Sequence, residues 1–134
     1  MMKKLAHIAI AVPDLEAAVA QYRDVLGVTV SAAQELPEHG VRIVFVALEN
    51  ATIELMEPSG ADSPIAGFLA RNPAGGIHHF CLDDPEFACT LERVQQQGLR
   101  TLGPPKIGAH GHPVLFLHPK DFQGTLIELE QTKE

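Results

Sequence analysis

The sequence repeats one pattern twice, and each copy carries a histidine and a glutamate at matching positions. These segments align: Leu5–Asp14 with Ile77–Glu86, Gly27 with Gly98, Gly40 with Gly111, Phe45 with Phe116, and Ile53–Leu55 with Ile127–Leu129. The offset is 72 residues at the start, 71 in the middle and 74 at the end, which requires a three-residue insertion in the turn 118–124. A repeat with one localised insertion indicates that the chain folds as two similar halves.

Apolar periodicity predicts the same order of elements in both halves. We expect strands at 5–12, 28–30, 41–48 and 52–57, with a helix that begins after the N-cap Asp14 and stops at Gly27. The second half is expected to have strands at 77–82, 99–102, 113–118 and 125–130 and a helix at about 86–97, stopped by Gly98. Each half therefore follows the order β-α-β-β-β. A linking helix at about 63–71, with Ser63 as N-cap and Pro64 at its first position, is predicted between them.

These elements predict an α+β fold with a single domain over residues 1–134. Its internal repeats cover about 5–58 and 76–131. One helix covers only one face of a four-stranded half, so the other face needs a partner or a ligand. The two halves are therefore expected to form an eight-stranded curved sheet around a cleft.

Strand alternation decides which repeated side chains share the face away from the helix. In the first strand His7 lies opposite the large apolar residues that suit packing under the helix. In the second copy the same pattern selects His79, rather than His78, as the equivalent of His7. Glu54 and Glu128 each lie between isoleucine and leucine and point away from them, toward the same face as the histidines.

Four such residues, related by the repeat, predict a divalent metal site in the cleft. Each residue alone has an ordinary explanation, as a hydrogen-bonded histidine or as a solvent-facing glutamate at a strand end. His7, Glu54, His79 and Glu128 together form a borderline-to-hard donor set. This set suits Co²⁺, Ni²⁺, Mn²⁺, Fe²⁺ or Zn²⁺, and water could complete an octahedron. A structural zinc site would more often contain thiolates, so we expect an open, catalytic site.

Composition limits the partners and the compartment. The net charge of −7 argues against nucleic acid as the main partner. No apolar run has the length of a membrane span or a signal peptide, and the two cysteines do not form a disulfide framework, so we expect a cytoplasmic protein with no membrane partner. Lys106, His110 and Lys120 nevertheless lie close together in sequence, either as solvated loop charges or as an anion-binding patch.

The chain also resembles the vicinal oxygen chelate superfamily and, within it, the methylmalonyl-CoA epimerase family. The His-His and Ile-Glu-Leu segments recur across the superfamily. The residues that carry the resemblance lie in Leu36–Val41, Asp62–Leu69, Ala74–His79, Lys106–Gly111 and Phe116–Asp121, and the similarity covers almost the whole chain. The much more specific segments are Asp-Ser-Pro-Ile at 62–65, Ile-Gly-Ala-His-Gly at 107–111 and His-Pro-Lys-Asp at 118–121.

The resemblance implies His7, His79 and Glu128 as metal ligands, while Glu54 matches a position that some epimerases fill with glutamine. It further implies that the metal stabilises an enolate formed by removal of the C2 proton of methylmalonyl-CoA, with Glu128 as one proton-transfer residue and Glu54 as a candidate for the other. Some relatives have a glutamate where this chain has Ile43. Lys106, His110 and Lys120 are candidate contacts to the acyl carboxylate or the CoA phosphates, and a homodimer is expected.

Three other functions compete with this interpretation. Glyoxalase I resembles the chain in its two-histidine, two-glutamate site but lacks the motifs around Lys106–Gly111 and His118–Asp121. Extradiol dioxygenases are a further alternative. Their site resembles two histidines and one glutamate, and it usually sits in a longer chain. A metal-free small-molecule-binding protein of the same fold would need no matched ligands.

Overall fold

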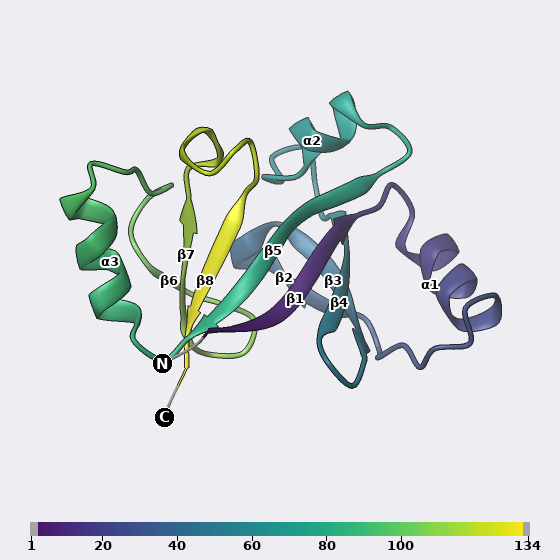
Figure 1. The fold of residues 1–134 in the computed structure, drawn as a ribbon. Coiled ribbons are helices and arrows are strands. Elements are labelled where there is room, and N and C mark those ends of the chain that lie inside the picture. The colour runs from purple at the N-terminus through teal and green to yellow at the C-terminus, as the bar shows by residue number, and fades with distance from the viewer. Residues whose placement is uncertain (1–2, 133–134) are drawn as a thin grey trace. The chain divides into compact units, whose positions relative to one another are not determined.

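The computed structural model describes residues 3–132, and within them it forms an α+β fold with one mixed sheet (Figure 1). The first half contains β1 (Lys4–Ala11), α1 (Leu15–Asp24), β2 (Gln34–Leu36), β3 (Val41–Ala47) and β4 (Thr52–Pro58). After α2 (Ala66–Arg71), the second half contains β5 (Gly76–Asp84), α3 (Phe87–Gln96), β6 (Lys106–Ile107), β7 (Pro113–Leu117) and β8 (Ile127–Gln131). The eight strands follow the order β2-β3-β4-β1-β5-β8-β7-β6. The predicted class and the two β-α-β-β-β repeats are confirmed.

The described residues group into two compact units, which follow the repeats closely. One unit contains residues 7–78, and the other contains residues 3–6 together with 79–132. Both β1 and β5 cross the boundary, so each of these strands contributes residues to both units. The single-domain organisation stays a prediction.

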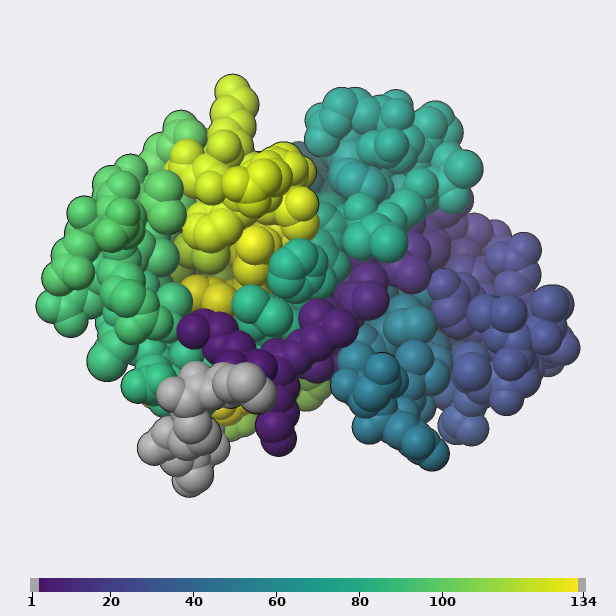
Figure 2. Space-filling model, in the orientation of Figure 1, coloured from purple at the N-terminus to yellow at the C-terminus, as the bar shows by residue number. Residues whose placement is uncertain are grey.

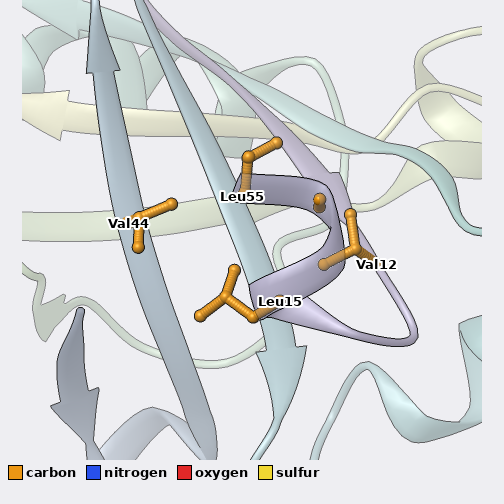
Figure 3. Packing of buried hydrophobic residues seen from close by; sticks show 5 residues of the cluster. Val12, Leu15, Val44 and Leu55 are labelled. Carbon is orange, nitrogen blue, oxygen red and sulfur yellow. The ribbon is translucent and has the colours of Figure 1, made fainter. Parts of the chain in front are cut away.

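In the unit of residues 7–78, β4 lies between β1, to which it is parallel, and β3, to which it is antiparallel. Its core lies between α1 and the sheet (Figure 3) and consists of the buried side chains of Val12, Leu15, Ala18, Val44 and Leu55. Leu15 is 1 % exposed, and burying a leucine side chain contributes about 2 kcal/mol. Hydrophobic burial therefore fixes which face of β1 and β4 the helix covers.

The start of α1 depends on two carboxylates from different parts of the chain. Asp14 accepts a hydrogen bond from the Ala17 backbone N–H at 3.2 Å, which confirms it as the N-cap. Glu57, at the end of β4, accepts one from the Leu15 backbone N–H at 2.8 Å. Negative charge at a helix N-terminus is favourable, so these contacts fix the helix against β4.

The second unit repeats this arrangement around β8. This strand lies between β5, to which it is parallel, and β7, to which it is antiparallel. α3 lies beside this part of the sheet, and in Figure 2 its green atoms adjoin the yellow atoms of the C-terminal segment. The buried cluster beneath it comprises Phe87, Val94, Leu115, Leu117 and Leu129.

Two predicted strands are wrong, at corresponding places in the two halves. Residues 28–30 and 99–102 are not strands, and β2 and β6 supply the additional strand of each half instead. The Ser31 N–H donates to the Phe45 carbonyl at 2.9 Å and the Leu102 N–H donates to the Phe116 carbonyl at 2.8 Å, but neither contact extends into a ladder. Val30 and Leu99 pack against the two cores without strand pairing, which explains their apolar character.

The linking helix is confirmed, but its predicted start is wrong. α2 begins at Ala66 with Ile65 as N-cap, and no side chain caps it. Ser63 is buried, and its hydroxyl accepts a hydrogen bond from the Ile65 N–H at 3.4 Å, within the turn before the helix. The Ser63 carbonyl accepts from the Ala66 N–H, so the chain makes a turn here before the helix starts.

None of the helices within residues 3–132 combines the length and apolar character needed to cross a membrane.

Candidate metal centre

The first histidine–glutamate pair lies in the unit of residues 7–78. His7 Nδ1, from β1, is 3.0 Å from Glu54 Oε2, from β4. The two strands are parallel with Ala9 opposite Glu54, and His7 shares the face of Ala9 because it lies two residues earlier. Both side chains are buried, and the small, fully buried side chain of Ala9 leaves them room.

The second pair repeats this geometry in the other unit. His79 Nε2, from β5, is 3.0 Å from Glu128 Oε1, from β8, and both residues are buried. The ring of Phe116 stands edge-on to the His79 ring, with centroids 5.1 Å apart, and Phe116 lies opposite Glu128 in the β7–β8 register. The aromatic contact therefore holds the His79 ring beside the carboxylate.

His78 takes no part in this pair. Its ring packs edge-on against Phe68 of α2, with centroids 5.3 Å apart. The alternation of β5 thus separates the two adjacent histidines, as the sequence pattern predicted.

The chemistry of the two pairs suits a divalent cation. Burial of a carboxylate is costly unless a charge or hydrogen-bond donor compensates it, and each unit places one imidazole nitrogen next to one carboxylate. Imidazole and carboxylate are the common nitrogen and oxygen donors for first-row divalent metals. One pair supplies two of the four to six positions that such ions take, so water or further protein donors would complete the coordination.

The predicted basic residues do not form one cluster. Lys106 pairs with Val114 at the beginning of β7, whereas Lys120 lies in the 3₁₀ turn Pro119–Asp121 beyond the other end of β7. Five strand residues span about 15 Å, so the two lysines lie at opposite ends of this strand. Both lysines are exposed, and His110 is half-exposed in the loop between β6 and β7.

An ion pair ties the inserted turn 118–124 to Arg100. Arg100 Nη2 and Nε donate to Asp121 Oδ1 and Oδ2 at 2.8 and 3.1 Å, and the Arg100 backbone N–H donates to Oδ2 at 2.9 Å. These hydrogen bonds from Arg100 lower the pKa of Asp121 to about 2. The insertion that distinguishes the second half therefore has a defined conformation.

Two further buried carboxylates were not among the predicted site residues. Asp84, at the end of β5, accepts a hydrogen bond from the Glu86 N–H at 2.9 Å and lies 3.7 Å from Lys3 Nζ. Glu130 lies two residues after Glu128, so strand alternation places it on the same face, and pairing with the neighbouring strands buries it. Ile43, the position at which the resemblance gives some relatives a glutamate, is 1 % exposed and lies opposite Met56 of β4.

Comparisons with known proteins agree with this fold. The family model described as the glyoxalase/bleomycin resistance protein/dioxygenase superfamily matches residues 6–116. An ethylmalonyl-CoA/methylmalonyl-CoA epimerase from Cereibacter sphaeroides is 59 % identical over 98 % of this chain and 99 % of the relative. The human mitochondrial methylmalonyl-CoA epimerase is 54 % identical over 96 % of this chain and 73 % of the relative. A solved methylmalonyl-CoA epimerase in complex with methylmalonyl-CoA and NH4+ is 31 % identical, with a TM-score of 0.89 over 98 % of this chain and 96 % of that chain.

Proposed function

We propose a reaction for this chain from its family, since it belongs to the glyoxalase/bleomycin resistance protein/dioxygenase superfamily and, within it, to the methylmalonyl-CoA epimerases. The proposed reaction is the interconversion of (R)- and (S)-methylmalonyl-CoA by removal and return of the proton on C2. The observation that carries this proposal is the buried histidine–glutamate pair, with a separation of 3.0 Å, at the matching position of each unit.

The ligand set that we propose is His7, His79 and Glu128, with Glu54 as a fourth ligand. A divalent metal bound there would supply Lewis-acid stabilisation to the enolate that forms when C2 loses its proton. The nitrogen and carboxylate donors support a first-row divalent ion, and we propose Co²⁺, with Mn²⁺, Ni²⁺, Zn²⁺ and Fe²⁺ as alternatives.

The carboxylates also have to move the proton. Inversion at C2 needs a proton donor and acceptor on each face of the planar enolate, and each contributes about 10²- to 10⁴-fold to the rate. We assign one face to Glu128 and the other to Glu54. The support for Glu54 is its burial beside His7, in a chain whose position 43 holds the apolar Ile43 where the resemblance gives some relatives a glutamate. A water molecule or another residue is the alternative for this face.

The remainder of the substrate carries negative charge at both of its ends. We propose Lys106, His110 and Lys120 as contacts to the acyl carboxylate or to the CoA phosphates. Their placement at the two ends of β7 supports separate contacts for separate anionic groups.

The decisive experiment follows the C2 proton of methylmalonyl-CoA by NMR in D₂O, with and without a chelator. We expect metal-dependent exchange together with inversion. Parallel assays with ethylmalonyl-CoA and with the glutathione hemithioacetal of methylglyoxal define the substrate class. Turnover of the hemithioacetal alone would overturn the proposal in favour of a lactoylglutathione lyase, and absence of bound metal in active protein would remove the metal from it.

A cytoplasmic homodimer completes the proposal. The presence of two cysteines without a disulfide supports a reducing compartment. Sedimentation analysis of the purified protein tests the dimer.

A further inference from the structure

A second buried carboxylate, Glu130, lies on the same face of β8 as Glu128. Ile127 and Leu129 pack into the core under α3. Glu128 and Glu130 alternate with them along β8, so both glutamates point to the opposite face. Glu130 is only 5 % exposed. Because residues two apart on a strand are separated by about 7 Å, Glu130 lies one step along the strand from the proposed metal ligand.

The loop 108–112 folds onto this face. Val114 lies opposite Glu130 in the register of β7 and β8, and a Cβ on Gly108 would lie 2.7 Å from Val114 Cγ1. The loop is closed by two hydrogen bonds, from the Gly108 N–H to the His112 carbonyl at 2.9 Å and from the Gly111 N–H to the Gly108 carbonyl at 3.0 Å. Glycine at position 108 thus allows the loop to rest directly on the strand that neighbours Glu130.

This packing brings the imidazole of His110 to Glu130. His110 Nδ1 is 3.7 Å from Glu130 Oε2, while half of the His110 side chain is exposed. The buried carboxylate attracts one side of the ring, and the exposed part can be reached from solvent. At 3.7 Å the contact is electrostatic attraction rather than a direct hydrogen bond, and it favours ring orientations that keep Nδ1 on the side of Glu130.

We propose that Glu130 orients His110 as the receptor for the free carboxylate of the acyl group. This proposal rests on the proposed function and assigns a specific role to one of its candidate contacts. An imidazole N–H donates a short, charge-assisted hydrogen bond to a carboxylate. Glu130 alone would repel an anionic acyl group bound near Glu128, and the imidazole of His110 beside it offsets this repulsion. Glu130 is therefore a positioning residue, and His110 is the residue that touches the substrate.

Two inhibitors that differ in one group test the assignment. Malonyl-CoA has the free carboxylate, and propionyl-CoA has a methyl group in its place, while their CoA moieties are identical. For His110→Ala we expect the inhibition constant of malonyl-CoA to rise on the order of tenfold and that of propionyl-CoA to stay unchanged. Glu130→Gln should likewise raise the inhibition constant of malonyl-CoA relative to that of propionyl-CoA. The double variant should be no worse than His110→Ala alone, since Glu130 acts through His110.

Controls separate this role from a general effect on the fold. Glu92→Gln removes an exposed carboxylate from α3 and should change neither inhibition constant. Thermal unfolding shows whether each variant is folded, and the exposed His110→Ala carries the test if Glu130→Gln does not fold. An equal rise in the inhibition constants of both compounds, or no change in that of malonyl-CoA, would overturn the assignment. Failure of the wild-type protein to epimerise methylmalonyl-CoA would instead overturn the proposed function itself.

Discussion

His79 Nε2 lies 3.0 Å from Glu128 Oε1, whereas the equivalent pair in the other unit joins Nδ1 of His7 to Glu54. The two copies thus use different ring nitrogens for the same contact. Both copies of the repeat place a histidine and a glutamate at matching positions, but the two pairs are not chemically identical. Inversion of a stereocentre needs two different sides, and this difference is compatible with such a division of roles.

His79→Ala should abolish tight metal binding, because it removes one of the two imidazole donors of the proposed site. His78→Ala is the matched control, since His78 packs against Phe68 instead. Metal content after dialysis, measured by plasma mass spectrometry, should fall well below one ion per chain in the first variant only. Metal loss in both variants would indicate a general effect on β5 rather than ligation.

Glu54→Gln and Glu128→Gln should impair proton transfer on opposite faces of the enolate. We expect Glu54→Gln to retain the metal through its amide oxygen but to lose about 10²-fold or more in exchange, because an amide cannot accept the C2 proton. Exchange into D₂O, started separately from each isomer of methylmalonyl-CoA, shows which face each glutamate serves. Unchanged exchange with metal still bound would remove that glutamate from proton transfer.

Metal removal should lower the thermal stability of the protein. A ligand that binds only the folded state stabilises it by about 2.7 kcal/mol at a free concentration of 100 Kd. We therefore expect the melting temperature to fall with chelator, to recover when Co²⁺ is added, and not to respond to Co²⁺ in His79→Ala. A wild-type melting temperature that does not change when metal is removed or added would contradict a site built from buried residues.

Asp121→Asn should destabilise the fold at neutral pH but much less at pH 2. Arg100 lowers the folded-state pKa of Asp121 to about 2, below the value of about 3.9 expected in the unfolded chain. The stabilising effect is therefore present above pH 4 and is lost as pH falls through 2. Urea unfolding at both pH values checks this, with the exposed Asp62→Asn as control. If Asp121→Asn lowers the free energy of unfolding by the same amount at both pH values, the result would contradict the stabilising role of the ion pair.

Gly75→Ala should destabilise the unit of residues 7–78 by about 1–3 kcal/mol. Gly75 has φ +92°, and an added Cβ would lie 2.5 Å from the Ala11 carbonyl oxygen. Gly60→Ala, where no heavy atom lies within 4 Å of the added Cβ, is the matched control. Chemical denaturation of the two variants should differ clearly, and similar stabilities would show that the loop before β5 can move away from β1.

Much of the fold followed from local patterns. The apolar runs, the N-cap Asp14 and the repeat itself predicted the order of elements, because period and capping depend on neighbouring residues. The short strands β2 and β6 could not be located in this way. Residues 28–30 and 99–102 have the apolar character of strands but use it to pack under the helices, and only the tertiary packing distinguishes these two uses.

The candidate site shows the same division. Alternation along one strand was sufficient to select His79 over His78 and to turn Glu54 and Glu128 away from the helices, because successive side chains on a strand point to opposite faces. The 3.0 Å pairs depend on the register between parallel strands more than 40 residues apart in sequence. The separation of Lys106 from Lys120 and the burial of Glu130 also arise from strand pairing. The sequence by itself determined which residues face one side of the sheet, and the tertiary structure decided which of them meet, since side-chain direction is a local property and strand register is a long-range one.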